Sequence, residues 1–120
     1  VLMAVRRYKE GLELSRLCSL NGHTVVGGFS KLLAHLEKER KTPFLISWCD
    51  LRYASGSGYE KVGFEKVRDV QGWSWTDFEN TFNRRQCRAG DGLTEREHAK
   101  ALRWVKIYDA GQRLYIKHFR

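Results

Sequence analysis

The sequence has 120 residues, which is enough for one domain with a single hydrophobic core. It carries 22 Lys and Arg against 14 Asp and Glu, and the resulting net charge of +8 favours anionic partners without selecting a fold. A hydrophobic content of 42% with fifteen aromatic residues argues against a disordered chain. No apolar run approaches the roughly 20 residues that a membrane-spanning helix needs, so we expect no membrane partner.

The three cysteines, Cys18, Cys49 and Cys87, lie far apart in the sequence. An odd, scattered number of cysteines is typical of a reducing compartment rather than of a disulfide scaffold. The four histidines do not combine with them at the spacing of a zinc site. We therefore expect a cytoplasmic protein that holds no metal.

The first 42 residues predict two strands and a helix. The apolar run Val1–Val5 and the alternating segment 12–20 both have the pattern of strands, with a turn at 6–11 between them. Because a strand begins the sequence abruptly, we expect a domain that lacks the N-terminal strands and helices of its full fold. Apolar residues at helical spacing from Phe29 predict a helix that begins at Gly28 and ends in a charged run.

The middle of the sequence continues the alternation of strands and helices. The nearly continuous apolar segment Phe44–Cys49 predicts a strand covered on both faces. A loop at 55–58, a short helical turn at 59–62 and a strand at 64–70 follow. This order of elements indicates an α/β domain.

Beyond residue 72 the pattern of apolar and polar residues is less regular. Trp73 and Trp75 alternate with polar residues and predict a strand. Thr94 and Glu97 have the spacing of a capping box and predict a helix that ends at about Arg103.

The C-terminal residues predict a β-hairpin. Segments 104–108 and 112–118 both alternate apolar and polar residues, and Asp109-Ala110-Gly111 lies between them as a turn. Together the elements predict a single domain over residues 1–120, built on a mixed sheet with flanking helices.

A pair of glycines precedes the predicted helix at Gly28, in the stretch Val25-Val26-Gly27-Gly28-Phe29-Ser30-Lys31. Glycines at a helix start let backbone N–H groups approach an anion, and the helix dipole favours negative charge there. The phosphate-binding patterns GxxxxGK[ST] and GxGxxG are both absent. A plain tight turn is therefore the alternative for this stretch.

Two segments together resemble the core of the GNAT acyltransferase fold. Residues 25–30 resemble its pyrophosphate loop, Q/R-x-x-G-x-G/A, although Val25 replaces the leading Q/R and Ser30 the final small residue. Tyr59–Phe64 matches its later Y-x-x-x-G-F signature in full. A closer resemblance, over about residues 1–118, is to a GNAT-like domain of bacteriophage proteins that often follows a nuclease domain in homing-endonuclease-like proteins. It rests on Glu13–Cys18, Val26–Leu33, Asp50–Tyr53, Tyr59–Phe64 and Tyr108–Gly111.

The resemblance implies a cofactor and a site. The cofactor would be acetyl-CoA or another CoA thioester, held by Val26, Gly27, Gly28, Phe29, Ser30 and Lys31. Mom-type phage enzymes, which modify adenine in DNA, use the same fold, and their polar active-site set resembles Arg16, Ser30, Asp50 and Tyr59. We expect these four to converge at the carboxyl ends of the strands. Tyr59 would protonate a leaving thiolate.

Each of these residues has a structural alternative. Arg16 could pair with Asp50, and Asp50 with Arg52 could cap the loop at a strand end. The hydroxyl of Ser30 could satisfy free N–H groups in the first helical turn. The ring of Tyr59 could serve only in packing.

A second candidate region, residues 73–88, interleaves aromatic and basic residues. Aromatic faces stack on bases, and guanidinium groups hold phosphates, so the region suits a single strand or a flipped base. The candidate nucleic-acid-binding residues are Trp73, Trp75, Arg84, Arg85 and Arg88. The tryptophans could instead face the core, and the arginines, which have no acidic residue close by in sequence after Glu79, could lie on a solvated loop.

We therefore expect a GNAT-like domain that acts with or on nucleic acid in the cytoplasm of a phage-infected bacterium. The resemblance implies that this nucleic acid is DNA and that the domain assists a nuclease or base modification. One alternative is an acetyl-CoA-dependent N-acyltransferase. Another is a non-catalytic remnant, stabilised by a partner chain or a second copy that completes the sheet. No cluster of histidines or acidic residues predicts DNA cleavage by this chain.

Overall fold

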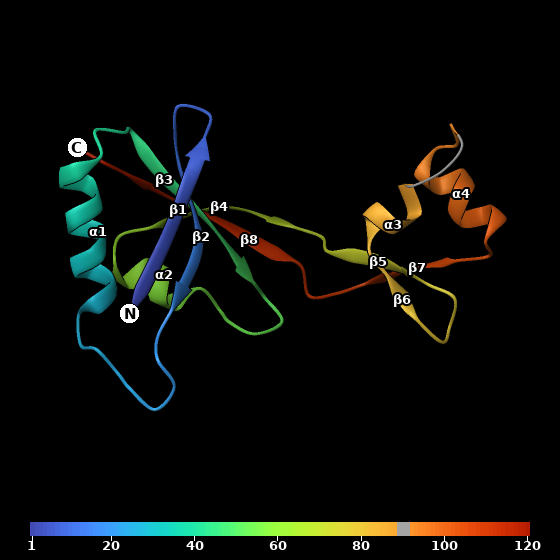
Figure 1. The fold of residues 1–120 in the computed structure, drawn as a ribbon, viewed down its shortest axis with the longest axis horizontal. Coiled ribbons are helices and arrows are strands. Elements are labelled where there is room, and N and C mark those ends of the chain that lie inside the picture. The colour runs from blue at the N-terminus through green and yellow to red at the C-terminus, as the bar shows by residue number, and fades with distance from the viewer. Residues whose placement is uncertain (89–91) are drawn as a thin grey trace. The chain divides into compact units, whose positions relative to one another are not determined.

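The computed structural model describes residues 1–88 and 92–120 and is a mixed α/β structure (Figure 1). Its contacts divide the chain into two compact units. Unit 1 comprises Val1–Asp69 and Arg113–Arg120, and unit 2 comprises Val70–Gln112. In the part of the chain that the structure describes, no helix is long and apolar enough to cross a membrane.

Unit 1 is built on a five-stranded mixed sheet with the strand order β1-β2-β3-β8-β4 (Figure 1). Strands β1 and β2 form an antiparallel hairpin, whereas β2 and β3 are parallel. A parallel pair needs a crossover connection, and helix α1 supplies it. The strands are β1 Leu2–Tyr8, β2 Gly11–Cys18, β3 Phe44–Asp50, β4 Glu65–Val70 and β8 Gln112–His118.

Helix α1, Gly28–Glu39, forms where the sequence predicts it. Its buried Leu33 and Leu36 come from the predicted apolar stripe and pack on the sheet, and burying one such side chain stabilises the fold by about 1.5–3 kcal/mol. The short helix α2, Ser57–Lys61, follows β3. The core that these elements share consists of Leu12, Leu14, Leu33, Leu36, Leu45, Cys49, Phe64 and Tyr115.

Unit 2 has a three-stranded sheet of order β6-β5-β7 and its own small core. That core contains Trp75, Cys87 and Ala99. The predicted capping box is confirmed, because Thr94 and Glu97 bond reciprocally at the start of α4. The elements are β5 Trp73–Thr76, β6 Thr81–Phe82, β7 Val105–Tyr108, α3 Arg84–Arg88 and α4 Glu95–Ala101.

The predicted C-terminal hairpin is wrong, although both of its segments are strands. β7 pairs antiparallel with β5, whereas β8 lies between β3 and β4 in the other sheet. The physical reason is burial: Tyr115 of β8 is 0% exposed in the core of unit 1. Asp109 accepts a hydrogen bond from the Gly111 N–H at 2.7 Å, so the turn forms but joins strands of different sheets.

Candidate functional site

The parallel strands β2 and β3 separate part-way along their length. They pair only from Leu12 opposite Leu45 to Leu14 opposite Ser47. Beyond that point β2 continues along β1, and a register shift leaves Ser15 as an extra residue between Leu14 and Arg16. A β-bulge of this kind bends its strand. The sheet therefore opens toward the carboxyl ends of its parallel pair, where α/β folds usually bind ligands.

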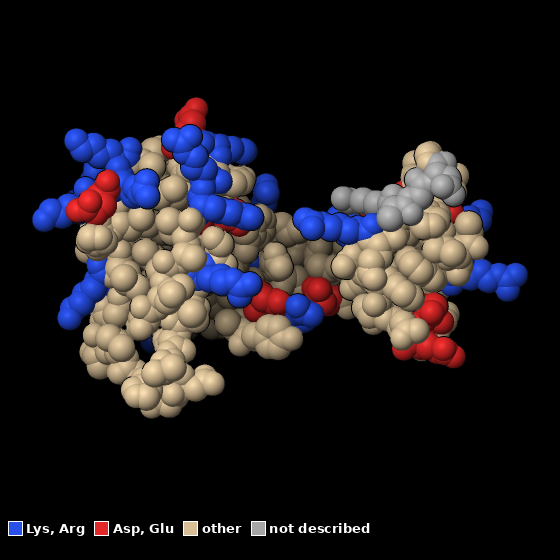
Figure 2. All heavy atoms as spheres, in the orientation of Figure 1, with Lys and Arg blue, Asp and Glu red and all other residues tan. Residues whose placement is uncertain are grey.

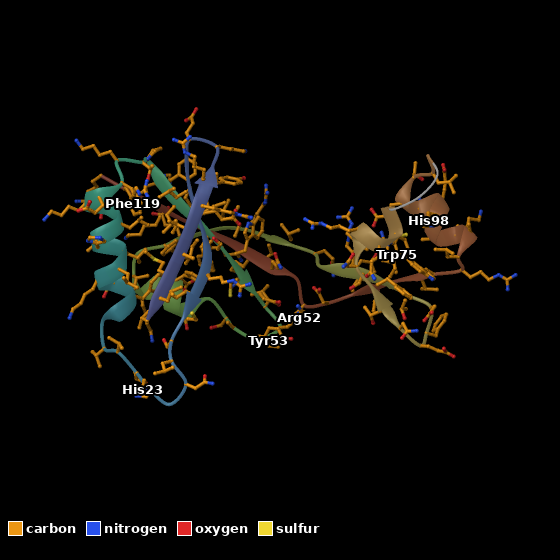
Figure 3. All side chains as sticks on the ribbon, in the orientation of Figure 1. His23, Arg52, Tyr53, Trp75, His98 and Phe119 are labelled. Carbon is orange, nitrogen blue, oxygen red and sulfur yellow. The ribbon has the colours of Figure 1, made fainter. Side chains whose placement is uncertain are left out.

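A pocket of about 520 Å³ lies at the end of β2. It is lined by Leu17 of β2, Phe29 of α1, the loop residues 53–56 and the first three residues of α2, Ser57, Gly58 and Tyr59. Tyr53 is 82% exposed on the loop after β3 (Figure 3). The pocket is lined by aromatic rings and by small Ala, Ser and Gly residues, which suits a narrow ligand.

The structure places Tyr59 in this pocket, with its ring held by other aromatic rings. The Tyr59 centroid lies 5.3 Å from those of Phe64 and Tyr115 and 6.0 Å from that of Phe29. The packing alternative for Tyr59 is thus present in the structure. Because the residue is only half-buried, its presence in the pocket lining is compatible with a role toward a ligand as well.

The other predicted catalytic residues have local partners or lie in solvent. Asp50 accepts hydrogen bonds from the backbone N–H of Arg52 at 3.0 Å and from its guanidinium at 2.7 Å, and this bonding lowers the pKa of the Asp50 carboxyl. Arg16 is exposed on β2, and Ser30 donates to the Gly27 carbonyl at 3.0 Å. Among the described residues, these side chains and Tyr59 form no hydrogen bond or ion pair with one another. Asp50 thus pairs with Arg52 rather than with Arg16.

The glycine pair before α1 has two different structural roles. Gly27 is the N-cap with φ +70°, a left-handed conformation that glycine adopts freely. Gly28 is buried, and a Cβ there would lie 2.8 Å from Val1 and 3.2 Å from Val25. No side chain of the described residues caps this helix. The Gly28 N–H instead donates to the Val25 carbonyl at 3.1 Å, and the neighbouring Val26, which is 87% exposed, and Lys31 lie in solvent.

In unit 2, Arg84 has the acidic partner that the sequence did not reveal. Its guanidinium lies 3.1 Å from the carboxylate of Glu95, eleven residues later, and 4.2 Å from the ring centroid of Trp73. Trp75 is 6% exposed and donates to the same carboxylate at 3.0 Å, below helices α3 and α4 (Figure 3). Arg85 is exposed. The side chain of Arg88, the third candidate arginine, lies outside the described residues.

Sequence reasoning missed several residues beside this cluster. Arg96, Lys100, Trp104 and Lys106 line a pocket of unit 2 together with Trp73 and Trp75. The capping box predicts the helix that carries Arg96 and Lys100, and their i, i+4 spacing puts them on one helix face. That spacing is the signal that could have identified the pair.

The positive charge is unequally divided between the units. Unit 1 holds fifteen Lys and Arg against eight Asp and Glu, a net +7, whereas unit 2 holds seven against six, a net +1. In Figure 2 basic side chains gather on unit 1 around the C-terminal end of α1 and the β1–β2 turn. Lys38, Arg40 and Lys41 lie at that end of α1 and line a shallow hollow there.

Neither a family model nor a curated protein matches this sequence. Within residues 1–88 and 92–120, no three His, Cys, Asp or Glu side chains are grouped in a way that could hold a metal ion. The features that point to a function are therefore the opened sheet of unit 1, the pockets and the distribution of charge.

Proposed function

We propose that this chain is a GNAT-like module of phage type that acts with or on nucleic acid. One observation carries the proposal: the unit that contains the opened parallel strands and their pocket also holds +7 of the net charge of +8. The proposal is also supported by the strand-helix-strand crossover with its glycine-led helix, the arrangement on which the GNAT resemblance rests. The parting of β2 and β3 adds an opening at the carboxyl ends of these strands. The excess of cations supplies phosphate contacts, which make binding strong at low salt.

The basic surface at the end of α1 is the first place to look for these contacts. Arg40 and Lys41 are exposed, and among the described residues neither forms an ion pair. Lys38 in the last helical turn also interacts favourably with the helix dipole, so its charge has a structural role as well. Arg40 and Lys41 are therefore the better probes of a phosphate contact.

The test is fluorescence anisotropy of a labelled DNA duplex titrated with the full chain over a range of salt concentrations. Two phosphate contacts contribute about 1.8 to the slope of log affinity against log salt on duplex DNA. We expect the slope of the double variant Arg40→Gln/Lys41→Gln to be smaller than that of the wild type by about 1.8. The matched control is Arg68→Gln/Arg103→Gln, which removes the same charge from exposed residues that do not line the hollow at the end of α1. Equal slopes for the wild type and the Arg40/Lys41 variant would remove this surface from the proposal.

A second candidate function is acyl transfer from a CoA thioester, favoured by the uncapped first turn of α1 and by Tyr59 in the neighbouring pocket. The resemblance assigns the pyrophosphate to the backbone N–H groups of Gly27, Gly28, Phe29 and Ser30, with Lys31 beside them. The Gly28 N–H, which donates to the Val25 carbonyl at 3.1 Å, would have to exchange that partner. Calorimetric titration with acetyl-CoA tests it. We expect Tyr59→Phe to bind like the wild type, because the phenol would act in proton transfer, whereas the absence of any heat signal would eliminate this function.

A third candidate is a non-catalytic module whose sheet is completed by a partner chain or a second copy. β1 is the first strand in the sheet order, so one of its edges has no neighbouring strand among the described residues, and its Leu2 is 56% exposed. An open strand edge can pair with another chain. Sedimentation velocity tests the homo-oligomer: a concentration-dependent dimer would support it, and a strict monomer at all concentrations would contradict it.

A further inference from the structure

A pocket of about 650 Å³ on unit 2 combines indole rings with cations. It lies between strands β5 and β7 and helix α4, and Ala99, which is 1% exposed, lies among its lining residues. The side chains that matter for a ligand are Trp73, Trp75, Trp104, Arg96, Lys100 and Lys106. Both aromatic side chains and positive charge therefore line one pocket.

The cations of this pocket differ in how far they are compensated. Arg84 forms an ion pair with Glu95 at 3.1 Å, and its charge is largely balanced. Lys106 lies 4.1 Å from the ring centroid of Trp73, and Arg96 and Lys100 are exposed on α4. Among the described residues, none of these last three forms an ion pair. The pocket thus retains positive charge that a ligand can neutralise.

The indole rings define the rest of the ligand. Trp73 is half-buried, with cations against its ring, and Trp104 stacks on Phe82 with centroids 4.0 Å apart. A planar ligand would therefore stack on the parts of the half-buried Trp73 and Trp104 rings that these contacts leave exposed. A planar group joined to negative charge is the chemistry of a nucleotide, because every base has a face that stacks on an aromatic ring.

We infer that this pocket binds single-stranded nucleic acid, with a base against the indoles and phosphates at Arg96 and Lys100. A smaller hollow of about 240 Å³ shares Trp73 and Arg84 with it and offers room for a neighbouring nucleotide. In a duplex the base faces are covered by their neighbours, so only a single strand or an extruded base can reach the indoles. The inference rests on the proposed association with nucleic acid and specifies which form of it unit 2 takes.

The experiment titrates the full chain with a thymidine oligonucleotide and follows tryptophan fluorescence, since three of the four tryptophans line the pocket. We expect quenching on binding. The variant Arg96→Gln/Lys100→Gln should bind at least about tenfold more weakly, and its salt slope should be smaller by about 1.4. The control Arg68→Gln/Arg103→Gln removes the same charge from exposed residues that do not line the pocket, and its affinity should stay within about threefold of the wild type.

Three further probes separate a base-binding pocket from a merely positive one. An abasic strand of the same length, a polyglutamate peptide and thymidine monophosphate should all bind much more weakly than the oligonucleotide. Equal binding of the abasic strand or the peptide would show recognition of charge alone, equal binding of the monophosphate would show a mononucleotide site, and either would overturn the inference.

The failure of this inference can be distinguished from failure of the proposed function. If the wild-type chain binds neither duplex nor single strand, the association with nucleic acid itself is refuted. If it binds both but the Arg96/Lys100 variant behaves like its control, only the pocket is refuted.

Discussion

Gly56 lines the pocket of unit 1 and packs directly against Tyr115. It is buried with φ +84°, and a Cβ there would overlap the ring and hydroxyl of Tyr115, which is itself 0% exposed. We expect Gly56→Ala to lower the free energy of unfolding by at least about 2 kcal/mol, because overpacking and left-handed strain add. Gly58 is the control: it lies in α2 with open space around it, and Gly58→Ala should be neutral or stabilising by up to about 1 kcal/mol. Urea denaturation measures both, and equal stabilities would contradict the packing described.

Asp69 provides a pH-dependent contribution to stability. Its carboxylate accepts hydrogen bonds from Arg113 at 2.7 and 3.2 Å, and this bonding lowers the pKa of Asp69 below its usual range. A lowered folded-state pKa stabilises the protein above the unfolded pKa of about 3.9 and loses that effect as pH falls through the folded value. Asp69→Asn should therefore be less stable than the wild type near neutral pH and lose less stability on acidification.

The measurement is urea denaturation of the wild type and Asp69→Asn at about pH 5 and about pH 2. Glu10→Gln is the control, because Glu10 lies on the exposed β1–β2 turn and forms no ion pair among the described residues. A wild type and an Asp69 variant that respond identically to acid would contradict the role of the Asp69–Arg113 pair.

For individual residues, the sequence predicted local hydrogen-bond partners but not the partners that lie on other elements. Asp50 and Arg52 are two residues apart, and their pairing was among the alternatives because it is local. The pairs Arg84–Glu95 and Arg6–Glu13 depend on which elements lie side by side. The members of these pairs are eleven and seven residues apart in sequence. The distance between two such side chains is set only when the elements that carry them pack together, so sequence spacing alone does not predict either pair.

Among the elements, α4 depends on its capping box. Thr94 accepts a hydrogen bond from the Glu97 N–H, and the Glu97 side chain bonds back to the Thr94 N–H. Replacing an N-cap threonine by alanine costs about 1 kcal/mol. We expect Thr94→Ala to destabilise unit 2 by about that amount, as measured by hydrogen exchange at α4. The control is Thr24→Ala, a change at an exposed loop residue, which should leave exchange at α4 unaltered. Unchanged exchange at α4 in the Thr94 variant would contradict the capping role.

The elements themselves were largely predictable, because their signals are local. The apolar stripe of α1 and the continuous apolar run of β3 each specify one element by period. Helix α3 was missed, although Asn83 and Gln86 bond reciprocally at its start and have capping-box spacing. The pairing of β8 was mispredicted because a turn signal reports only neighbouring residues, whereas burial of Tyr115 selects the sheet.

For the whole molecule, separate cores imply that unit 1 can fold without unit 2. The core residues of unit 1 include none from unit 2. Gly111 lies close to the carbonyl of Val70, where a Cβ would be 2.6 Å from the oxygen, so the ends of the inserted segment meet. We expect replacement of residues 71–111 by Asn-Gly, which favours a tight hairpin turn, to leave a chain with cooperative thermal unfolding by circular dichroism.

The control for this excision is the same shortened chain with Tyr115→Ala, which opens the core of unit 1. Removing a large buried aromatic side chain costs about 3–5 kcal/mol, so the control should lose its cooperative transition. A shortened chain that shows no transition even with Tyr115 present would contradict the independence of the two cores.

Charge divides the molecule into a basic unit with an opened sheet and a nearly neutral unit with an aromatic pocket. The most direct test is the affinity of the full chain for a DNA duplex and for a single strand of equal length, measured by anisotropy at about 50 and about 200 mM salt. We predict binding of both forms that weakens at least about tenfold over this range, as counterion release requires. Affinity that does not change with salt, or no binding at the lower salt concentration, would contradict the proposed binding of nucleic acid through phosphate contacts.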